Sequence, residues 1–214
     1  MLKRLGYWAT AAVVAFATPA LSHPHVFAEA RVEIVAADDG TLKELRNVWR
    51  FDDIFSSSVL MDFDKNSDLK LDHSELTDIA NTIRDSLGDY SYFTFVTRDG
   101  ASSEIGRPDV FNVDFKDNQL LVFFIAKPKT PVKVGGRMTF GIYDPTLYTA
   151  IDFAKDEDMV LEGEAFSACT QKVVRPDPDE VIAQNQLNLT EAFFSDPTGN
   201  DMGKLFATRM EVTC

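Results

Sequence analysis

Two groups of polar residues in this sequence have the types and spacing needed to bind metal ions. The first is an acidic segment, DKNSDLKLDHSE, over residues 64–75, and the second is a histidine pair, His23 and His25, on either side of a proline. Carboxylate and amide oxygens bind hard cations such as Ca²⁺, whereas imidazole nitrogens bind borderline ions such as Zn²⁺, Ni²⁺, Co²⁺ and Cu²⁺. The two groups therefore indicate two different metals.

The acidic segment has the spacing of an EF-hand calcium loop. Such a loop needs side-chain oxygens at positions one, three, five, nine and twelve, and a backbone carbonyl at position seven. Position six is usually glycine because the backbone there has a positive φ; Leu69 at this position costs about 1–2 kcal/mol. The alternatives are calcium binding, weak or distorted, and a helix pair that is only structural. The residues in the ligand positions are Asp64, Asn66, Asp68, Lys70, Asp72 and Glu75.

Apolar residues repeat at helical spacing on both sides of this loop, which predicts a helix–loop–helix unit over about residues 53–87. A solvated acidic turn has no need of such a stripe, so the flanks support the loop assignment independently. Leu71, at position eight, is expected to anchor the loop, and His73, at position ten, to lie on the surface. Seven of the eight positions of the stripe are apolar, and the exception is Ser56; the eight are Ser56, Val59, Leu60, Phe63, Leu76, Ile79, Ala80 and Ile83.

The histidine pair follows a predicted signal peptide. Residues 1–22 begin with basic residues, continue with an apolar run and end in a small-residue cleavage site. Cleavage after residue 22 would free the α-amine of His23, which could chelate a transition metal together with its imidazole, while His25 adds a second imidazole. Pro24 has no backbone N–H, which excludes a chelate through deprotonated amides.

A site built on two histidines needs a further ligand from elsewhere in the protein. Asp52, Asp53 and Asp144 are candidates because they lie at the ends of predicted strands. Two other interpretations of the histidine pair stay open. One is a copper enzyme built on a histidine brace, and the other is a terminus whose histidines bind no metal.

The charge balance limits the possible partners. The chain has a formal net charge of −13, and without residues 1–22 the remaining 19 basic and 34 acidic residues give −15. Such a chain is not expected to bind nucleic acid or an anionic membrane surface; divalent cations and basic partner surfaces match it instead. The sequence has three histidines in all, so few residues could serve as the base of a histidine-based hydrolytic triad. No enzymatic activity is expected.

The elements that must position these residues are mostly short strands. Alternating patterns and turn signals predict a hairpin over residues 26–34 and 42–51, then strands at 92–97, 110–115, 120–126, 137–143 and 147–153. A helix is predicted at 179–186, a second at 190–195 or 201–207, and a final strand ends at Cys214. An exported chain with Cys169 and Cys214 as its only cysteines is expected to join them in a disulfide.

This pattern predicts an α+β fold. It combines a mainly antiparallel, β-sandwich-like sheet with the inserted EF-hand-like helix–loop–helix and short C-terminal helices. Residues 23–214 are expected to form a single periplasmic metal-binding domain after the signal peptide at 1–22.

A series of short motifs also resembles a known family. HPHVF, VWRFDDIFSS, the acidic loop, YFT, IYDPTLYTA, RPDPDE and the final cysteine occur in this order across nearly the whole mature chain. Together they resemble a family of uncharacterised periplasmic proteins that includes the zinc-uptake accessory protein ZevA. By position, His23 and His25 match the family's histidine pair, and residues 64–75 match its acidic loop, from which Leu69 departs.

The resemblance implies a periplasmic metal-binding role beside an inner-membrane permease of the nickel/cobalt-transporter type. The expected function is capture of a divalent transition metal for that permease, with zinc as the first expectation and nickel or cobalt as the next. Copper at the same terminus, and calcium in the acidic loop, are further expectations. The alternatives are the histidine-brace copper enzyme and a calcium-stabilised structural or adhesion module.

Overall fold

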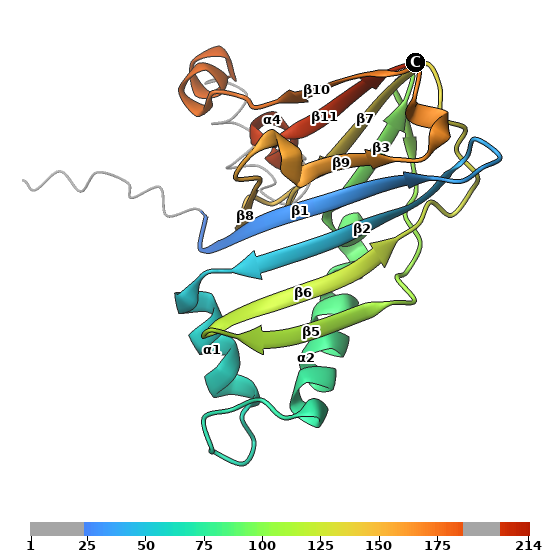
Figure 1. The fold of residues 1–214 in the computed structure, drawn as a ribbon. Helices are drawn as coiled ribbons and strands as arrows, with labels where there is room; N and C mark the ends of the chain where they lie inside the picture. The colour runs from blue at the N-terminus through green and yellow to red at the C-terminus, as the bar shows by residue number, and fades with distance from the viewer. Residues whose placement is uncertain (1–23, 186–201) are drawn as a thin grey trace, which may run out of the picture.

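Two β-sheets form the framework of the computed structural model, which describes residues 24–185 and 202–214 (Figure 1). The predicted signal peptide, His23 and the possible helix at 190–195 lie outside the described residues. The larger sheet carries the start of the described chain, and the smaller one ends at Cys214.

The six-stranded sheet is built around the first hairpin, β1 (Val26–Ala36) and β2 (Leu42–Phe51). Beyond β2 lie β6 (Gln119–Ala126) and then β5 (Phe111–Lys116), all antiparallel. On the other side of β1 lie β8 (Thr149–Asp152) and β9 (Met159–Glu162), which pair with the two halves of β1 in parallel. The chain therefore returns twice to the same edge of β1.

The five-stranded sheet is antiparallel throughout. Its order is β10 (Thr170–Val174), β11 (Arg209–Thr213), β7 (Arg137–Ile142), β3 (Thr94–Arg98) and β4 (Ala101–Ser103). β11 lies between β10 and β7, and the predicted disulfide joins Cys169, just before β10, to Cys214, just after β11. This confirms the predicted pairing and fastens the end of the sheet to its edge strand.

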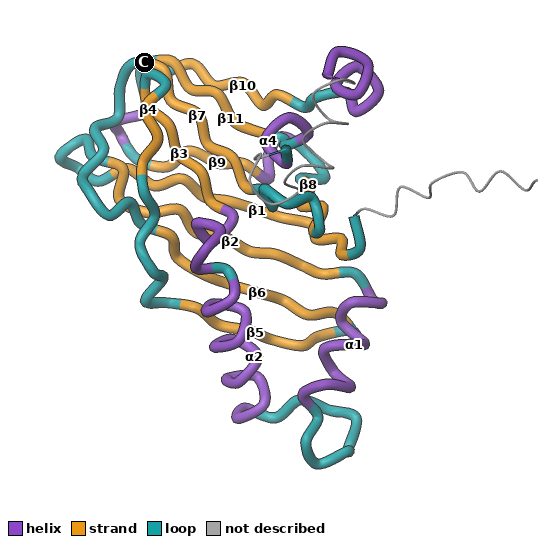
Figure 2. Tube along the Cα trace, turned by 180° about the vertical axis from the view of Figure 1, so that it is seen from behind, coloured by secondary structure: helices purple, strands orange, loops and turns teal. Residues whose placement is uncertain are grey.

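Two helices interrupt the strands after β2. α1 (Asp53–Phe63) and α2 (His73–Ser86) are joined by the acidic loop, and α2 packs across the inner side of β5 (Figure 2). The remaining helical segments are short: η1 (Gly88–Phe93), η2 (Asp156–Asp158), η3 (Glu164–Phe166), residues 178–185 and α4 (Gly203–Phe206). Among the described residues, no helix has the length and apolar character needed to cross a membrane.

The core lies between the two sheets and under α2. On β2, Trp49 is almost fully buried, and its ring lies 4.8 Å from that of Phe124 on β6 and 6.0 Å from that of Phe93. Phe140 on β7 supplies buried surface from the second sheet. Truncating one such aromatic side chain typically costs about 3–5 kcal/mol. The core therefore fixes the relative position of the strands that carry the candidate sites.

The observed fold confirms the predicted α+β, sandwich-like class. The hairpin, the helix pair and the strands predicted near 92–97, 110–115, 120–126, 137–143 and 147–153 are all present, with shifts of a few residues at their ends. β4, β9 and β10 were not predicted, and the parallel pairing of β8 and β9 with β1 is an exception to the antiparallel pattern.

Candidate metal-binding regions

The two predicted metal-binding groups lie in different parts of the molecule. The acidic loop forms the tip beyond α1 and α2 (Figure 1). His25 lies directly before β1, an internal strand of the six-stranded sheet. Within residues 24–185 and 202–214, no group of three or more histidine, cysteine, aspartate or glutamate side chains is placed to hold a metal ion. Each region is therefore described by what its polar groups contact.

The first half of the acidic loop is folded by hydrogen bonds to its own backbone. The Asp64 carboxylate accepts the backbone N–H groups of Asp68 at 3.2 Å and Leu69 at 2.8 Å. The Asn66 side-chain oxygen accepts the same Asp68 N–H at 2.9 Å, and Asp68 accepts from Lys70 at 2.9 Å. The oxygens predicted as ligands at positions one, three and five thus hold the loop in its turn.

Glu75 closes the loop from its last position. Its side chain is buried, with 2% of the residue exposed, and its two oxygens accept the backbone N–H groups of Lys65 at 2.8 Å and Asp72 at 2.9 Å. One carboxylate therefore joins the two ends of the loop. Bidentate binding of calcium by Glu75 would require it to exchange both of these hydrogen bonds for the ion.

Asp72 forms the N-cap of α2. Its carboxylate accepts the backbone N–H groups of Ser74 at 2.7 Å and Glu75 at 3.0 Å, which completes a capping box with Glu75. The hydrogen bond from Glu75, followed by those from Ser74, lowers the pKa of Asp72 below its ordinary value. Position nine of the loop thus starts the helix.

The backbone at position six follows the expectation for an EF-hand loop. Leu69 has a φ of 61°, in the left-handed region that the loop needs there, and its side chain is mostly exposed. Leu71 is partly buried against the core, as predicted for the anchor at position eight. Across the loop, Lys65 forms an ion pair with Asp78 on α2. The loop therefore adopts the left-handed backbone of an EF-hand loop at Leu69, although leucine disfavours this conformation.

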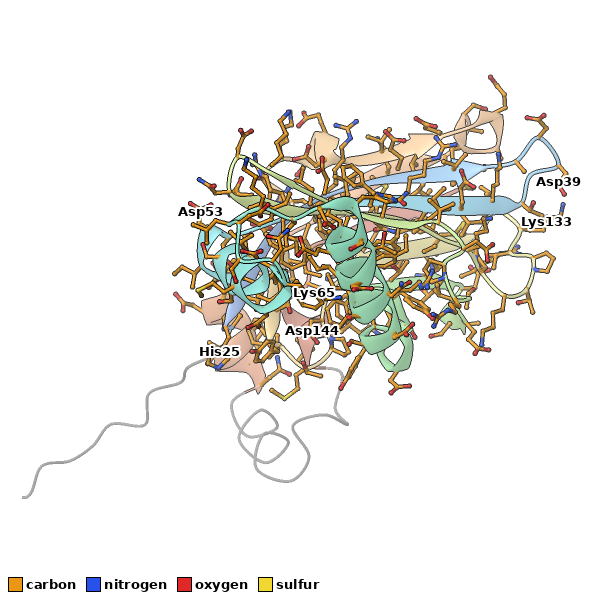
Figure 3. All side chains as sticks on the ribbon, turned by 90° about the horizontal axis from the view of Figure 1, so that it is seen from below. His25, Asp39, Asp53, Lys65, Lys133 and Asp144 are labelled. Atoms are coloured by element: carbon orange, nitrogen blue, oxygen red, sulfur yellow. A yellow bond between two sulfur atoms is a disulfide. The ribbon has the colours of Figure 1, made fainter. Side chains whose placement is uncertain are left out.

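His25 is exposed and lies beside the loop before β8, more than one hundred residues later in the chain. Its backbone N–H donates to the carbonyl of Tyr148 at 2.9 Å, and the two rings are 5.2 Å apart and tilted. The parallel register of β1 and β8, in which Phe27 faces Ala150, places His25 opposite Tyr148. Asp144 also lies at this side of the molecule (Figure 3).

Two of the three candidate carboxylates for a third ligand, Asp52 and Asp144, accept backbone N–H groups and so stabilise a helix start and a turn. Asp52 is the N-cap of α1, accepting from Ile54 and Phe55, and it also accepts the backbone N–H of Phe27 at 2.9 Å. Burial raises the pKa of Asp52, but these backbone hydrogen bonds outweigh it, so that the pKa lies below its ordinary value. Asp53, in the first turn of α1, is exposed.

Asp144 has a similar role between β7 and β8. It is buried, and its carboxylate accepts from the backbone and the hydroxyl of Thr146, at 2.8 and 2.7 Å, and from the backbone of Thr149 at 2.9 Å. These bonds shape the turn that brings Tyr148 to His25. Asp52 and Asp144 thus fix the backbone on both sides of the start of β1.

Sequence reasoning overlooked the aromatic residues around His25. Phe27 and Tyr148 are about half exposed although both are large and apolar. The sequence does indicate that Phe27 is exposed. It is an aromatic residue at an outward position of a strand whose inward positions are Val26, Ala28 and Ala30. The role of Tyr148 depends on the pairing of β8 with β1, which local pattern does not reveal.

Comparison with known proteins gives a family but no characterised relative. A family model described as a protein of unknown function matches residues 8–214. No curated protein matches the chain.

Proposed function

The chain belongs to that family, DUF1007, whose match covers nearly its whole length, and we propose that this member is a periplasmic metal-binding accessory protein. It captures a divalent transition metal, most readily Zn²⁺ and otherwise Ni²⁺ or Co²⁺, and presents the ion to an inner-membrane permease of the nickel/cobalt-transporter type. A relationship to ZevA within the family is part of this proposal. The metal ion is the protein's cargo.

The observation that carries the proposal is the placement of His25. Its backbone is held by the carbonyl of Tyr148, and the strand that follows is buried on one face by the core. The residue is nevertheless exposed, at the end of an internal strand. A nitrogen ligand on a firm backbone at the surface supports capture of a borderline metal and its release to a partner by ligand exchange.

A periplasmic location is supported by two features. Residues 1–22 have the pattern of a signal peptide, and Cys169 is joined to Cys214 in a disulfide. Disulfides persist in oxidising compartments such as the bacterial periplasm and are rare in the cytosol.

For the acidic loop we propose weak calcium binding as a structural clamp. The left-handed backbone at Leu69, together with the packing of Leu71, favours this role. The binding is weak because calcium would have to displace the hydrogen bonds that Glu75 makes to Lys65 and Asp72. The expected effect of calcium is a raised melting temperature, which Glu75→Gln abolishes.

The transition-metal proposal is tested by calorimetric titration of residues 23–214 with Zn²⁺, Ni²⁺, Co²⁺ and Cu²⁺. The variant His23→Ala/His25→Ala should bind Zn²⁺ at least about tenfold more weakly, since it removes both nitrogen side chains. The control is His73→Ala, which removes the third histidine, exposed on α2, and should leave the affinity unchanged. Unchanged affinity in the double variant would refute the terminal site.

The same samples separate the alternatives. Redox turnover after loading with Cu²⁺ would favour the histidine-brace copper enzyme. A melting temperature that rises with Ca²⁺ and responds to no transition metal would favour a calcium-stabilised structural or adhesion module.

A further inference from the structure

A groove lies on the outer face of the six-stranded sheet. The helix α2 packs on the opposite face (Figures 1 and 2). It has a volume of about 380 Å³ and spans β8, β1 and β2. The residues that shape it are Phe27, Glu29, Arg50, Ala150, Asp152 and Ala154. His25 lies two residues before Phe27, so the groove begins beside the proposed metal ligand.

The register of the sheet explains why this face is hollow. Phe27 pairs with Ala150, and Glu29 pairs with Asp152 on one side and with Arg50 on the other. Ala150 and Ala154 are too small to fill the space beside the large ring of Phe27. The depression is therefore built by the strands themselves.

Exposed apolar residues lie in the groove and next to its lining in sequence: Phe27 lines it, Tyr148 lies two residues before Ala150, and Ile54 two residues after Asp52. Phe27 is 54% exposed, Tyr148 52% and Ile54 82%. The carboxylate of Asp52 accepts the backbone N–H groups of both Phe27 and Ile54, at 2.9 Å each, which holds these two residues in a fixed relation. Exposed apolar residues that cluster on an ordered backbone indicate an interaction surface, whereas single scattered ones do not.

The charges in the groove favour a cationic occupant. Glu29 is paired with Arg50 on the neighbouring strand. Asp152 is 3.5 Å from the guanidinium of Arg175, but its side chain is 76% exposed. With Asp52 included, the lining holds three carboxylates and one guanidinium, and the whole chain is acidic.

The geometry points to a docking groove for a short partner segment that carries arginine next to an aliphatic residue. A planar guanidinium can stack on the exposed rings of Phe27 or Tyr148 while it donates hydrogen bonds to Asp152, which the compact ammonium of lysine does less well. An aliphatic side chain would fill the space over Ala150. That the segment belongs to the permease rests on the proposed function, whereas the docking chemistry does not.

The test uses a fluorescein-labelled octapeptide in which arginine and leucine alternate. Its binding to metal-free residues 23–214, in the presence of a chelator, is followed by fluorescence anisotropy. The peptide should bind, its lysine analogue should bind more weakly, and a glutamate analogue should not bind. Phe27→Ala and Asp152→Asn should each weaken binding at least about fivefold, the usual loss at an interface anchor.

Matched controls lie on the same face of the same sheet. Phe123→Ala on β6 and Asp114→Asn on β5 remove an exposed aromatic ring and an exposed carboxylate away from the groove, and they should leave binding unchanged. Equal binding by Phe27→Ala and Phe123→Ala would overturn the proposal. So would a wild-type dimer in sedimentation that Phe27→Ala dissociates, because a second copy would then occupy the groove.

The two proposals fail separately. His23→Ala/His25→Ala should keep its affinity for the peptide, and Phe27→Ala should keep its affinity for Zn²⁺. Loss of groove-dependent peptide binding with intact histidine-dependent Zn²⁺ binding refutes only the docking groove. The reverse result refutes only the metal site.

Discussion

The acidic loop and the start of β1 both use carboxylates to fix the backbone, but only the second links segments that are distant in sequence. In the loop, Asp64, Asp68 and Glu75 accept backbone N–H groups from within the same twelve residues, and Glu75 is buried. At the start of β1, Asp52 links Phe27 to the beginning of α1, 25 residues away. Asp144 shapes the turn before β8, and this turn brings the ring of Tyr148 to within 5.2 Å of that of His25.

The acidic loop is a turn stabilised by its own residues, whereas the surface at the start of β1 is formed by segments that are distant in sequence. The loop gains its shape from its own hydrogen bonds, so its polar groups contribute to stability first. At the start of β1, Asp52 holds Phe27 and Asp144 holds the turn before β8, and the residues His25, Phe27 and Tyr148 are exposed. We therefore expect substitutions in the loop to change stability most, and substitutions at the exposed end of β1 to change binding most.

The largest effect on stability is expected for Glu75→Ala. The substitution removes the buried Glu75 carboxylate and with it both part-buried hydrogen bonds, from the N–H groups of Lys65 and Asp72, which together should cost about 2–4 kcal/mol of unfolding free energy. Urea unfolding in the presence of a chelator measures the loss. Glu157→Ala, at an exposed position in η2, is the control and should stay within about 0.5 kcal/mol of wild type; equal losses in both would contradict the closing role of Glu75.

A smaller loss is expected for Asp52→Ala at the other region. The substitution removes the N-cap of α1 and the tether to Phe27, and caps of this kind contribute about 1–2 kcal/mol. The neighbouring Asp53→Ala removes an exposed carboxylate from the same turn and should cost well under about 1 kcal/mol. If the two variants unfold at the same urea concentration, Asp52 does not organise this end of the sheet.

Leu69→Gly should stabilise the protein by about 1 kcal/mol. Glycine adopts the φ of 61° at this position without the steric cost that leucine carries, and little burial is lost because Leu69 is 75% exposed. Leu205→Gly, in the helix α4, should instead destabilise. Thermal melts with and without Ca²⁺ measure both effects, and a lower melting temperature for Leu69→Gly would show that the leucine side chain holds the turn.

The smallest effect is expected in acid. The pKa values of Asp52 and Asp72 both lie below the ordinary value of 3.8 in the folded protein. Their contribution to stability is therefore complete above that value and is lost as the pH falls through the lowered folded pKa values. Urea unfolding at about pH 5 and about pH 3 should show the decrease, with a shallower one in Asp72→Asn. A wild-type protein that gains stability over this interval would contradict the assignment.

Local pattern predicted the elements whose contacts are local. The first hairpin and the helix pair agree with the structure because alternation, turn residues and helical spacing are all contained in short stretches. The left-handed backbone at Leu69 was likewise predictable from its place in a twelve-residue loop. The use of Glu75 to close that loop by hydrogen bonds follows from burial, which local spacing does not indicate.

The surroundings of His25 were less predictable because three separate segments form them. β8 reaches β1 only after the chain has completed β7, and its parallel register decides that Tyr148 faces His25. Its place near a strand end makes Asp144 a candidate metal ligand in the sequence. In the structure its carboxylate accepts hydrogen bonds from the backbone N–H groups of Thr146 and Thr149. β4 and β9 were missed because strands of three or four residues carry little alternation.

The position of β11 has a consequence for the order of folding. This strand is synthesised well after β7 and β10, yet it lies between them and supplies hydrogen bonds to both. Until residues 209–213 have left the ribosome, β10 has no strand that joins it to β7, and Cys169 has no partner at Cys214. Folding during synthesis can therefore complete the first hairpin early but not the sandwich.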